Sequence, residues 1–312
     1  MKDPLIFLSA GIMFALLCFA QVTIEVLERL KPGRNLSEIR LRTRSWWIMI
    51  FILEAALFLG RSATLGLVTC LSFFALREYL SRVPTRVSDR KILFWMFLAI
   101  PIQFYLVHRE WLIPFLCFIP LYGLCFIGIR LLLTGKIKGF VLALSTFQLG
   151  LLVTVYSISH IAYLVLINKS PSLEMTVGAL LYFVFVTQVN DIYQFIAGKL
   201  FGKHKIMPSI SPKKTTEGLL GGMLLTVITS AILAPRLMPL SPLQGGLAGV
   251  ILSLFGFFGD VLLSAIKRDL EIKDFSQIIP GHGGVLDRID SLTLSAPLYF
   301  HLIRYLAEGV PT

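Results

Sequence analysis

Charged and hydroxyl side chains gather near the C-terminal end of a chain that is otherwise strongly apolar. Four of them stand at i, i+4, i+7 and i+8, a spacing that puts all four on one face of a helix. They are Asp260, Ser264, Lys267 and Arg268. Asp260 lies inside the apolar run 245–266, and a carboxylate inside a membrane costs about 2.5–3.5 kcal/mol unless it faces a cavity, a partner or an ion. The pattern therefore predicts a polar site at the end of a membrane helix.

A glycine-rich turn, PGHGG at 280–284, and the motif DRID at 287–290 follow this helix. Glycines have no Cβ atom, so the backbone N–H groups of such a turn can converge on an anion. Asp287 and Asp290 are three residues apart and share a face if the segment is helical, and their carboxylate oxygens suit Mg²⁺. Groups that bind phosphate and groups that bind a metal are thus expected side by side.

A second polar stretch covers 188–222. Asn190 and Asp191 lie inside an apolar helix, where adjacent polar groups are costly unless they are used. Lysines and hydroxyls follow, up to the start of the next helix, and the candidates among them are Lys203, Ser211, Lys213, Lys214 and Thr215. Hydroxyls and free N–H groups at the start of a helix, flanked by lysines, predict a phosphate-binding site.

The composition places the chain among membrane proteins, because 56% of its 312 residues are hydrophobic and only 15% are charged. We expect a single integral membrane domain over 1–312, with N-terminal helices and basic loops in 1–186 and the catalytic part in 187–312. The net charge is +11, but its lysines and arginines lie in short loops, with no basic helix or aromatic platform for nucleic acid. We interpret the positive charge as a signal that sets the membrane topology and as attraction to anionic lipid and to the phosphates of a nucleotide.

Apolar windows predict an all-α polytopic membrane protein with about nine transmembrane helices and a weaker, short tenth. The nine windows are 4–27, 46–60, 63–80, 92–107, 112–133, 139–167, 175–196, 218–235 and 245–266, and the tenth is 292–306. The first is long for a signal peptide and lacks a convincing cleavage site, so it is interpreted as a retained helix.

The number of lysines and arginines alternates between high and low from one loop to the next. The loops 28–45, 77–91, 130–138, 197–217 and 267–291 hold 6, 5, 3, 5 and 4 of them, whereas the intervening loops hold one each. By the positive-inside rule the N-terminus lies outside and the polar stretches face the cytoplasm. The basic segment 28–45 either gathers anionic lipid or serves only as an orientation signal before Trp46 and Trp47, and we favour the second interpretation.

Two isolated polar residues have structural interpretations. Glu78 is expected to pair with Arg77 or Arg82 rather than to act as a catalytic acid. His160 is expected to be a buried, hydrogen-bonded histidine rather than a proton relay.

The polar stretches resemble the phosphatidate cytidylyltransferases, also called CDP-diacylglycerol synthases. The C-terminal match comprises Ser264, Lys267, Arg268, Lys273, Asp274, 280–284, Asp287, Arg288 and Asp290. The second match comprises Asp191, Gly198, 202–205 and 211–218, apart from Thr216. The chain has Gln194 and Phe195 where the family has Ala-Tyr, and Thr216 where Trp is common. These departures indicate a side branch and leave the lipid acceptor open.

The resemblance implies transfer of CMP from CTP to phosphatidic acid, with release of pyrophosphate. It implies Mg²⁺, in one site or a two-metal centre, with Asp260 and Asp287 as ligands and Asp290 and Asp191 as further candidates. The predicted catalytic residues are Ser264, Lys267, Arg268, His282 and Arg288, and the predicted CTP-binding residues are Asn190, Asp191, Lys203, Ser211, Lys213, Lys214, Thr215 and Lys273. His282 either donates to the departing pyrophosphate or shapes the turn.

The expected partners are phosphatidic acid, CTP and the bilayer, without nucleic acid, and a homodimer is compatible with the resemblance. A compact chain without targeting extensions fits a prokaryotic inner membrane. Two other functions stay open: a CTP-dependent lipid or polyprenol kinase, and an ion-coupled transporter that uses Asp191 and Asp260. The transporter is disfavoured because the charges lie in loops on one side and no inverted repeat is evident.

Overall fold

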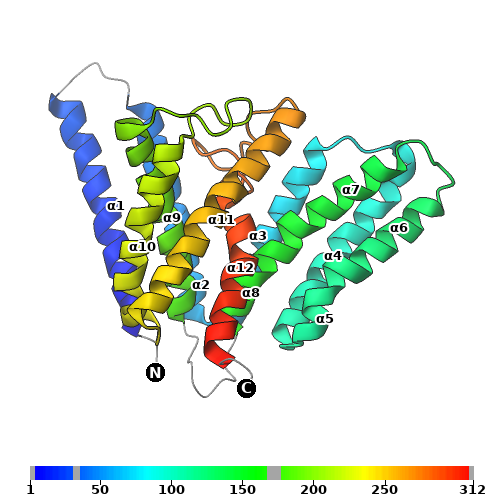
Figure 1. Cartoon of the computed structure of the whole chain (residues 1–312), viewed down its shortest axis with the longest axis horizontal. Coiled ribbons are helices and arrows are strands. Elements are labelled where there is room, and N and C mark those ends of the chain that lie inside the picture. Colours follow the sequence, from blue (N-terminus) through cyan, green and yellow to red (C-terminus); the bar gives the residue numbers. More distant parts are fainter. Residues whose placement is uncertain (1–3, 31–35, 167–176, 309–312) are drawn as a thin grey trace.

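The computed structural model describes residues 4–30, 36–166 and 177–308. Within these ranges every regular element is a helix, and the extended pairings are two isolated bridges. The helices are packed side by side and connected at their ends (Figure 1). The helical fold class predicted from the sequence is confirmed.

The N-terminal part contains six helical segments, two of which change their winding midway. In order they are α1 (Pro4–Leu30), α2 (Ser37–Leu59), α3 (Arg61–Arg82), then η1 (Val87–Asp89) with α4 (Arg90–His108), then α5 (Leu112–Cys117) with η2 (Phe118–Gly123) and α6 (Leu124–Leu132), and α7 (Phe140–Leu151) with η3 (Leu152–Tyr156) and α8 (Ser157–Leu166). The segments η2 and η3 are π-helical. Pro120 lies in η2, and proline cannot donate a helical hydrogen bond.

The C-terminal part contains α9 (Val177–Phe201), α10 (Thr216–Leu237), α11 (Pro242–Asp269) and α12 (Asp290–Glu308). Thr215 caps α10 by accepting from the amide of Gly218, and Ser241 and Gln244 form a capping box at the start of α11. Small residues bring α10 and α11 together, since a Cβ atom on Gly245 would lie 2.5 Å from that of Ala234. The residues 270–289 between α11 and α12 are called the signature loop below.

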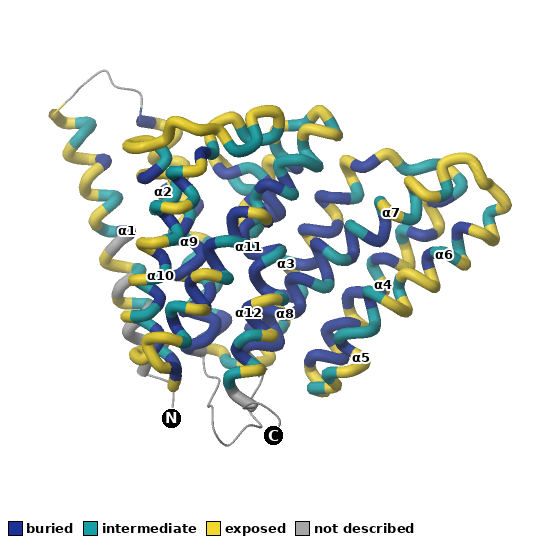
Figure 2. Tube along the Cα trace, viewed as in Figure 1, coloured by how far each residue is buried: buried dark blue, intermediate teal, exposed yellow. Residues whose placement is uncertain are grey.

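Seven helices of the described part are long and apolar enough to cross a membrane. They cover 61–82, 87–108, 112–132, 140–164, 178–201, 216–237 and 242–269. Exposed residues lie on the outer faces of the bundle, whereas α3, α8, α9, α11 and α12 are mostly buried where they meet (Figure 2). Many exposed side chains, such as Phe94, Ile129 and Val141, are large and apolar, as expected of surfaces that face lipid. The number of spans and their orientation stay predictions.

Each predicted apolar window falls on a helical segment, but one boundary was wrong. The window 46–60 belongs to a helix that begins at Ser37. Its first turns are charged, and the pair Glu38–Arg42, 2.5 Å apart, supports them at a spacing of four residues. A hydropathy window does not detect such a polar extension. His160 is buried and lies 2.7 Å through Nδ1 from the carbonyl of Tyr156, as the favoured interpretation requires.

Candidate active site

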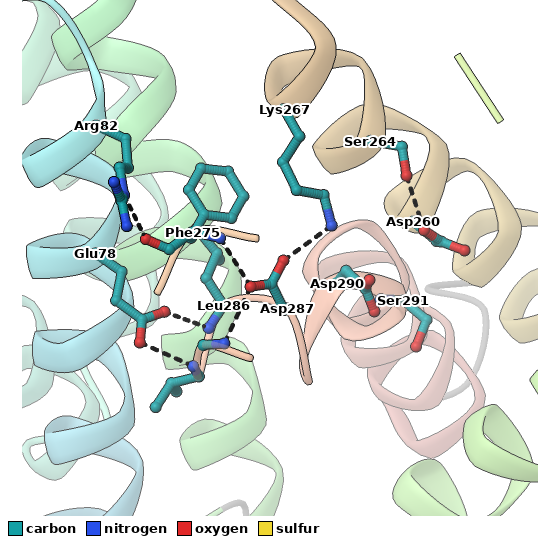
Figure 3. A network of polar contacts seen from close by, with 12 residues as sticks. Glu78, Arg82, Asp260, Ser264, Lys267, Phe275, Leu286, Asp287, Asp290 and Ser291 are labelled. Carbon is teal, nitrogen blue, oxygen red and sulfur yellow. Dashed lines mark hydrogen bonds and ion pairs between the residues drawn. The ribbon is translucent and has the colours of Figure 1, made fainter. Parts of the chain in front are cut away.

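The signature loop is held by a buried carboxylate of its own, Asp287, which is 3% exposed. Its Oδ1 accepts from Lys267 Nζ at 2.9 Å, and its Oδ2 accepts from the amides of Phe275 at 2.9 Å and Gly284 at 3.0 Å (Figure 3). Lys267 comes from the polar face of α11. Asp287 therefore joins the loop to that helix.

A second buried carboxylate, Glu78 on α3, reaches the loop from the other side (Figure 3). It is 2% exposed and accepts from the amides of Val285 and Leu286, each at 2.9 Å, and from the hydroxyl of Ser276 at 2.6 Å. Arg82, one turn further along α3, donates to the carbonyl of Phe275 at 2.7 Å. The structural role predicted for Glu78 is right, but its partners are the loop amides rather than Arg77 or Arg82.

Of the glycine-rich turn, the amide of Gly284 is directed at an anion, and that anion belongs to the protein. The amides of residues 284 to 286 bind Asp287 and Glu78, and those of His282 and Gly283 bind the carbonyl of Ile279. A Cβ atom on Gly284 would lie 2.5 Å from Glu78 Oε2. Glycine is required there because the carboxylate approaches the backbone closely.

The polar face of α11 is present as predicted, and its side chains have separate partners. Ser264 donates to Asp260 Oδ1 at 3.2 Å, while Lys214 Nζ lies 2.8 Å from Asp260 Oδ2. Arg268 Nε donates to the carbonyl of Ile210, in the segment before α10, at 3.3 Å. The two polar stretches of the sequence therefore meet at α11.

Three aspartates, Asp191, Asp260 and Asp290, lie close enough for their charges to interact. Lys214 and Lys267 are the cations beside them. Asn190 is fully buried and uses its Oδ1 to accept from Gln194 and Thr226, each at 3.0 Å. Within the described ranges its Nδ2 is buried without a partner, whereas the hydroxyl of Ser291 lies beside the carboxylate of Asp191.

The predicted metal ligands do not assemble as one group. Among the described residues, no three His, Cys, Asp or Glu side chains are arranged to hold an ion. Both oxygens of Asp287 already accept hydrogen bonds, and a metal there would displace Lys267. Mg²⁺ commonly takes only one or two carboxylates together with substrate phosphates. Asp260 and Asp290, with interacting charges, fit that requirement better than Asp260 and Asp287.

Two cavities contain predicted site residues. The first has a volume of about 580 Å³ and lies between α9, α10 and α11. It brings together predicted residues from both polar stretches, namely Asp191, Ser211, Lys213, Lys214, Thr215 and Asp260. Lys214 also lies over the ring of Phe257, 4.2 Å from its centroid. Lys203 is not among the lining residues, and its amide donates to Glu217 at 2.9 Å.

The second cavity has a volume of about 750 Å³ and lies between α2 and the signature loop. It contains three further predicted residues, Lys273, His282 and Arg288. Its other wall, with Arg42 and Trp46, was missed by the sequence analysis. The arginines before Trp46 were visible in the sequence, but nothing local connects them to a loop 239 residues further on.

The fold and the site define a helical membrane protein in which lysines, hydroxyls and carboxylates are positioned to handle phosphate groups. The family model described as "Cytidylyltransferase family" matches residues 40–306. The chain belongs to the cytidylyltransferase family, and it is a nucleotidyltransferase.

Relatives of two kinds are similar to this chain. Protein YnbB of Escherichia coli, described as uncharacterized, is 38% identical over 299 residues, which are 95% of this chain and 98% of that protein. The phosphatidate cytidylyltransferase of Aquifex aeolicus is 41% identical over 127 residues, 41% of this chain and 48% of that protein. That of Mycobacterium bovis is 42% identical over 107 residues, 34% of this chain and 35% of that protein.

Replacing Glu78 tests its role in holding the loop. Glu78→Gln should lower the free energy of unfolding by about 1.5–3 kcal/mol, because an amide nitrogen would face loop amides that now donate to a charged group. Thermal unfolding in detergent measures the loss. Glu25→Gln, an exposed change on α1, is the control and should have little effect. Equal midpoints for Glu78→Gln and the wild type would contradict the role.

The pH dependence of stability tests the burial of His282. Burial and then nearby Arg288 lower the pKa of His282 from its usual 6.5. Its contribution to stability is therefore full above about pH 6.5 and is lost as the pH falls through the lower folded pKa. Between about pH 7.5 and about pH 5.5 the unfolding midpoint of the wild type should fall more than that of His282→Asn. Parallel curves would contradict the interpretation.

Proposed function

We propose that the protein is a phosphatidate cytidylyltransferase, which transfers CMP from CTP to phosphatidic acid to give CDP-diacylglycerol and pyrophosphate in phospholipid biosynthesis. The observation that carries the proposal is the first cavity, where Lys213, Lys214 and Thr215 line the same space as Asp191 and Asp260. The names of two relatives that match 41% and 34% of the chain support the same reaction.

The reaction joins two anions. An oxygen of the phosphatidate phosphate forms a bond to the α-phosphorus of CTP, the bond from that phosphorus to the bridging oxygen breaks, and pyrophosphate leaves. A phosphate monoester has a second pKa of about 6, so the nucleophile is already anionic near neutrality and needs no strong base. The protein must position the two phosphates and offset their charge. Lys213 and Lys214 supply that charge in the first cavity.

A divalent ion would add to this charge. Asp260 and Asp290 would hold Mg²⁺ between themselves and the substrate phosphates. When bound, the ion would neutralise charge on the phosphate oxygens. Lys214, which is paired with Asp260, stands beside that position.

The acceptor lipid would enter past Phe195. This residue is 67% exposed and lines the first cavity, so it offers an apolar surface to acyl chains. Gln194, the neighbouring departure from the family pattern, lines the same cavity and donates to Asn190 Oδ1. The two changes thus border one cavity, with Phe195 exposed and Gln194 in contact with the buried Asn190.

Lining residues of the two cavities come from the segment before α10, the signature loop and the start of α2. These segments lie at one end of the bundle (Figure 1). The positive-inside rule assigns these basic segments to the cytoplasm, where CTP is available. We propose an enzyme of the prokaryotic inner membrane with its active site facing the cytoplasm.

The experiment uses purified protein with radiolabelled CTP, phosphatidic acid and Mg²⁺. Formation of a radiolabelled liponucleotide together with pyrophosphate would support the proposal. Release of CDP with a phosphorylated lipid would point to the kinase, and solute uptake driven by an ion gradient without CTP consumption would point to the transporter.

Removing the charge of Asp260 tests the reaction centre. Asp260→Asn should lower turnover by about 100-fold or more, because a charged group beside the reacting phosphates is lost. Asp269→Asn, an exposed change on the same helix, should leave turnover within about twofold. Full activity of a folded Asp260→Asn protein would remove Asp260 from the site.

The role of Phe195 is tested by replacing it and measuring the KM for the lipid and for CTP separately. Phe195→Ala should raise the KM for phosphatidic acid about tenfold, because burying a phenylalanine side chain contributes about 1.5–3 kcal/mol. The KM for CTP should not change. Phe201→Ala is the matched control, since Phe201 is 66% exposed and lines neither cavity. A rise in the KM for CTP instead would place the lipid elsewhere.

A further inference from the structure

The connection between α6 and α7, residues 130–142, forms a tip at the edge of the molecule farthest from α1 (Figure 1). Arg86 Nη1 donates to the carbonyl of Lys138 at 2.5 Å and to that of Lys136 at 3.4 Å. Two glycines with positive φ, 68° and 76°, flank these lysines, and they are Gly135 and Gly139. The tip is therefore a turn held through its backbone, and its shape does not depend on the lysine side chains.

A pocket of about 570 Å³ lies at this turn and is called the tip pocket below. Its lining residues are apolar or glycine, apart from Lys136. Ile137 is 88% exposed, and Leu132 and Val141, which also line the pocket, are exposed as well (Figure 2). Large apolar side chains so exposed fit contact with lipid better than contact with water. The tip pocket thus combines apolar walls with one ammonium group.

The charge of the tip is entirely positive. Its cations are Arg130, Lys136 and Lys138. Residues 111–173 contain no Asp or Glu, so this stretch offers these cations no carboxylate. Asp89, at the start of α4, is buried and lies 2.5 Å from Arg86. Because lysines and arginines near a membrane surface attract anionic lipid, the tip is complementary in charge to an anionic headgroup.

A phospholipid with a net negative headgroup matches both properties of the tip pocket. A soluble phosphate would pair with the cations but would leave the apolar walls in water. A second copy of the tip would bring like charges together, since residues 111–173 of neither copy supply a carboxylate to offset them. The positive-inside rule assigns the loop 130–138 to the cytoplasmic side, where the leaflet carries anionic lipids.

We propose that the tip pocket binds one anionic phospholipid, with its phosphate beside Lys136 and part of an acyl chain against Ile137 and Val141. The tip pocket shares no lining residue with the two cavities of the candidate active site. The inference therefore goes beyond the proposed function and does not rest on it. The bound lipid covers the apolar side chains of the tip and joins the turn to the surface of the bilayer.

The test compares two phospholipids with the same acyl chains on the purified full chain in detergent, with native mass spectrometry measuring the dissociation constant of the first bound lipid. The wild type should bind anionic phosphatidylglycerol about fivefold more tightly than zwitterionic phosphatidylcholine. Lys136→Gln should reduce this preference to less than about twofold, because the ammonium group is lost. Lys91→Gln, an exposed change of the same charge on α4 and outside the pocket, is the matched control and should keep the preference.

Ile137→Ser is the second variant and tests the apolar wall. It should weaken the binding of both lipids about tenfold and leave their ratio unchanged, because the buried apolar area is lost for both. A wild-type ratio in Lys136→Gln or wild-type affinities in Ile137→Ser would overturn the proposal. So would displacement of phosphatidylglycerol by an equal concentration of glycerol 3-phosphate, which would indicate a soluble phosphate, or a dimer that Ile137→Ser dissociates, which would indicate a second copy.

Discussion

The site depends on two buried carboxylates that hold an irregular loop by its backbone. Glu78 and Asp287 together accept four backbone amides of the signature loop, besides the hydroxyl of Ser276 and the ammonium of Lys267. An irregular segment packed beside membrane helices cannot leave its amides unpaired, and a buried carboxylate cannot remain without donors. The loop amides donate to the carboxylates, so both kinds of group are paired. The positions of Lys273, His282 and Arg288 follow from this arrangement, since all three belong to the loop.

The same constraint explains the glycines and connects the two halves of the chain. Gly284 leaves room for Glu78, and Gly283, with φ of 86°, leaves room for Asp287. The glycine-rich turn therefore approaches carboxylates of the protein. Because Glu78 lies on α3 and Ser45 on α2, helices of the N-terminal part hold the signature loop in place. The predicted division of the chain into 1–186 and 187–312 is therefore a division of the sequence, and residues from both parts contribute to the candidate site.

Much of the fold could be predicted because a membrane chain has few options. Backbone groups in a bilayer must be paired within each segment, so apolar windows become helices, and the windows coincide with the helical segments. Helical periodicity likewise placed Asp260, Ser264 and Lys267 on one face. The contacts of Glu78 with Ser276 and of Arg42 with Gly281 span 198 and 239 residues. No local pattern encodes such contacts, which is why the contact of the basic segment 28–45 with the signature loop was not predicted and Glu78 was given the wrong partner.

Two lysines of the site, Lys214 and Lys267, are paired with aspartates, and such pairs would link the binding of anions to that of cations. Lys214 lies 2.8 Å from Asp260, and Lys267 lies 2.9 Å from Asp287. A substrate phosphate that takes Lys214 as its partner competes with Asp260 for it, and a carboxylate released from an ammonium group gains affinity for a divalent ion. Phosphate and Mg²⁺ would then favour each other's binding without any movement of the backbone. Such an exchange would fit a site in which, among the described residues, no three His, Cys, Asp or Glu side chains form a preformed cluster.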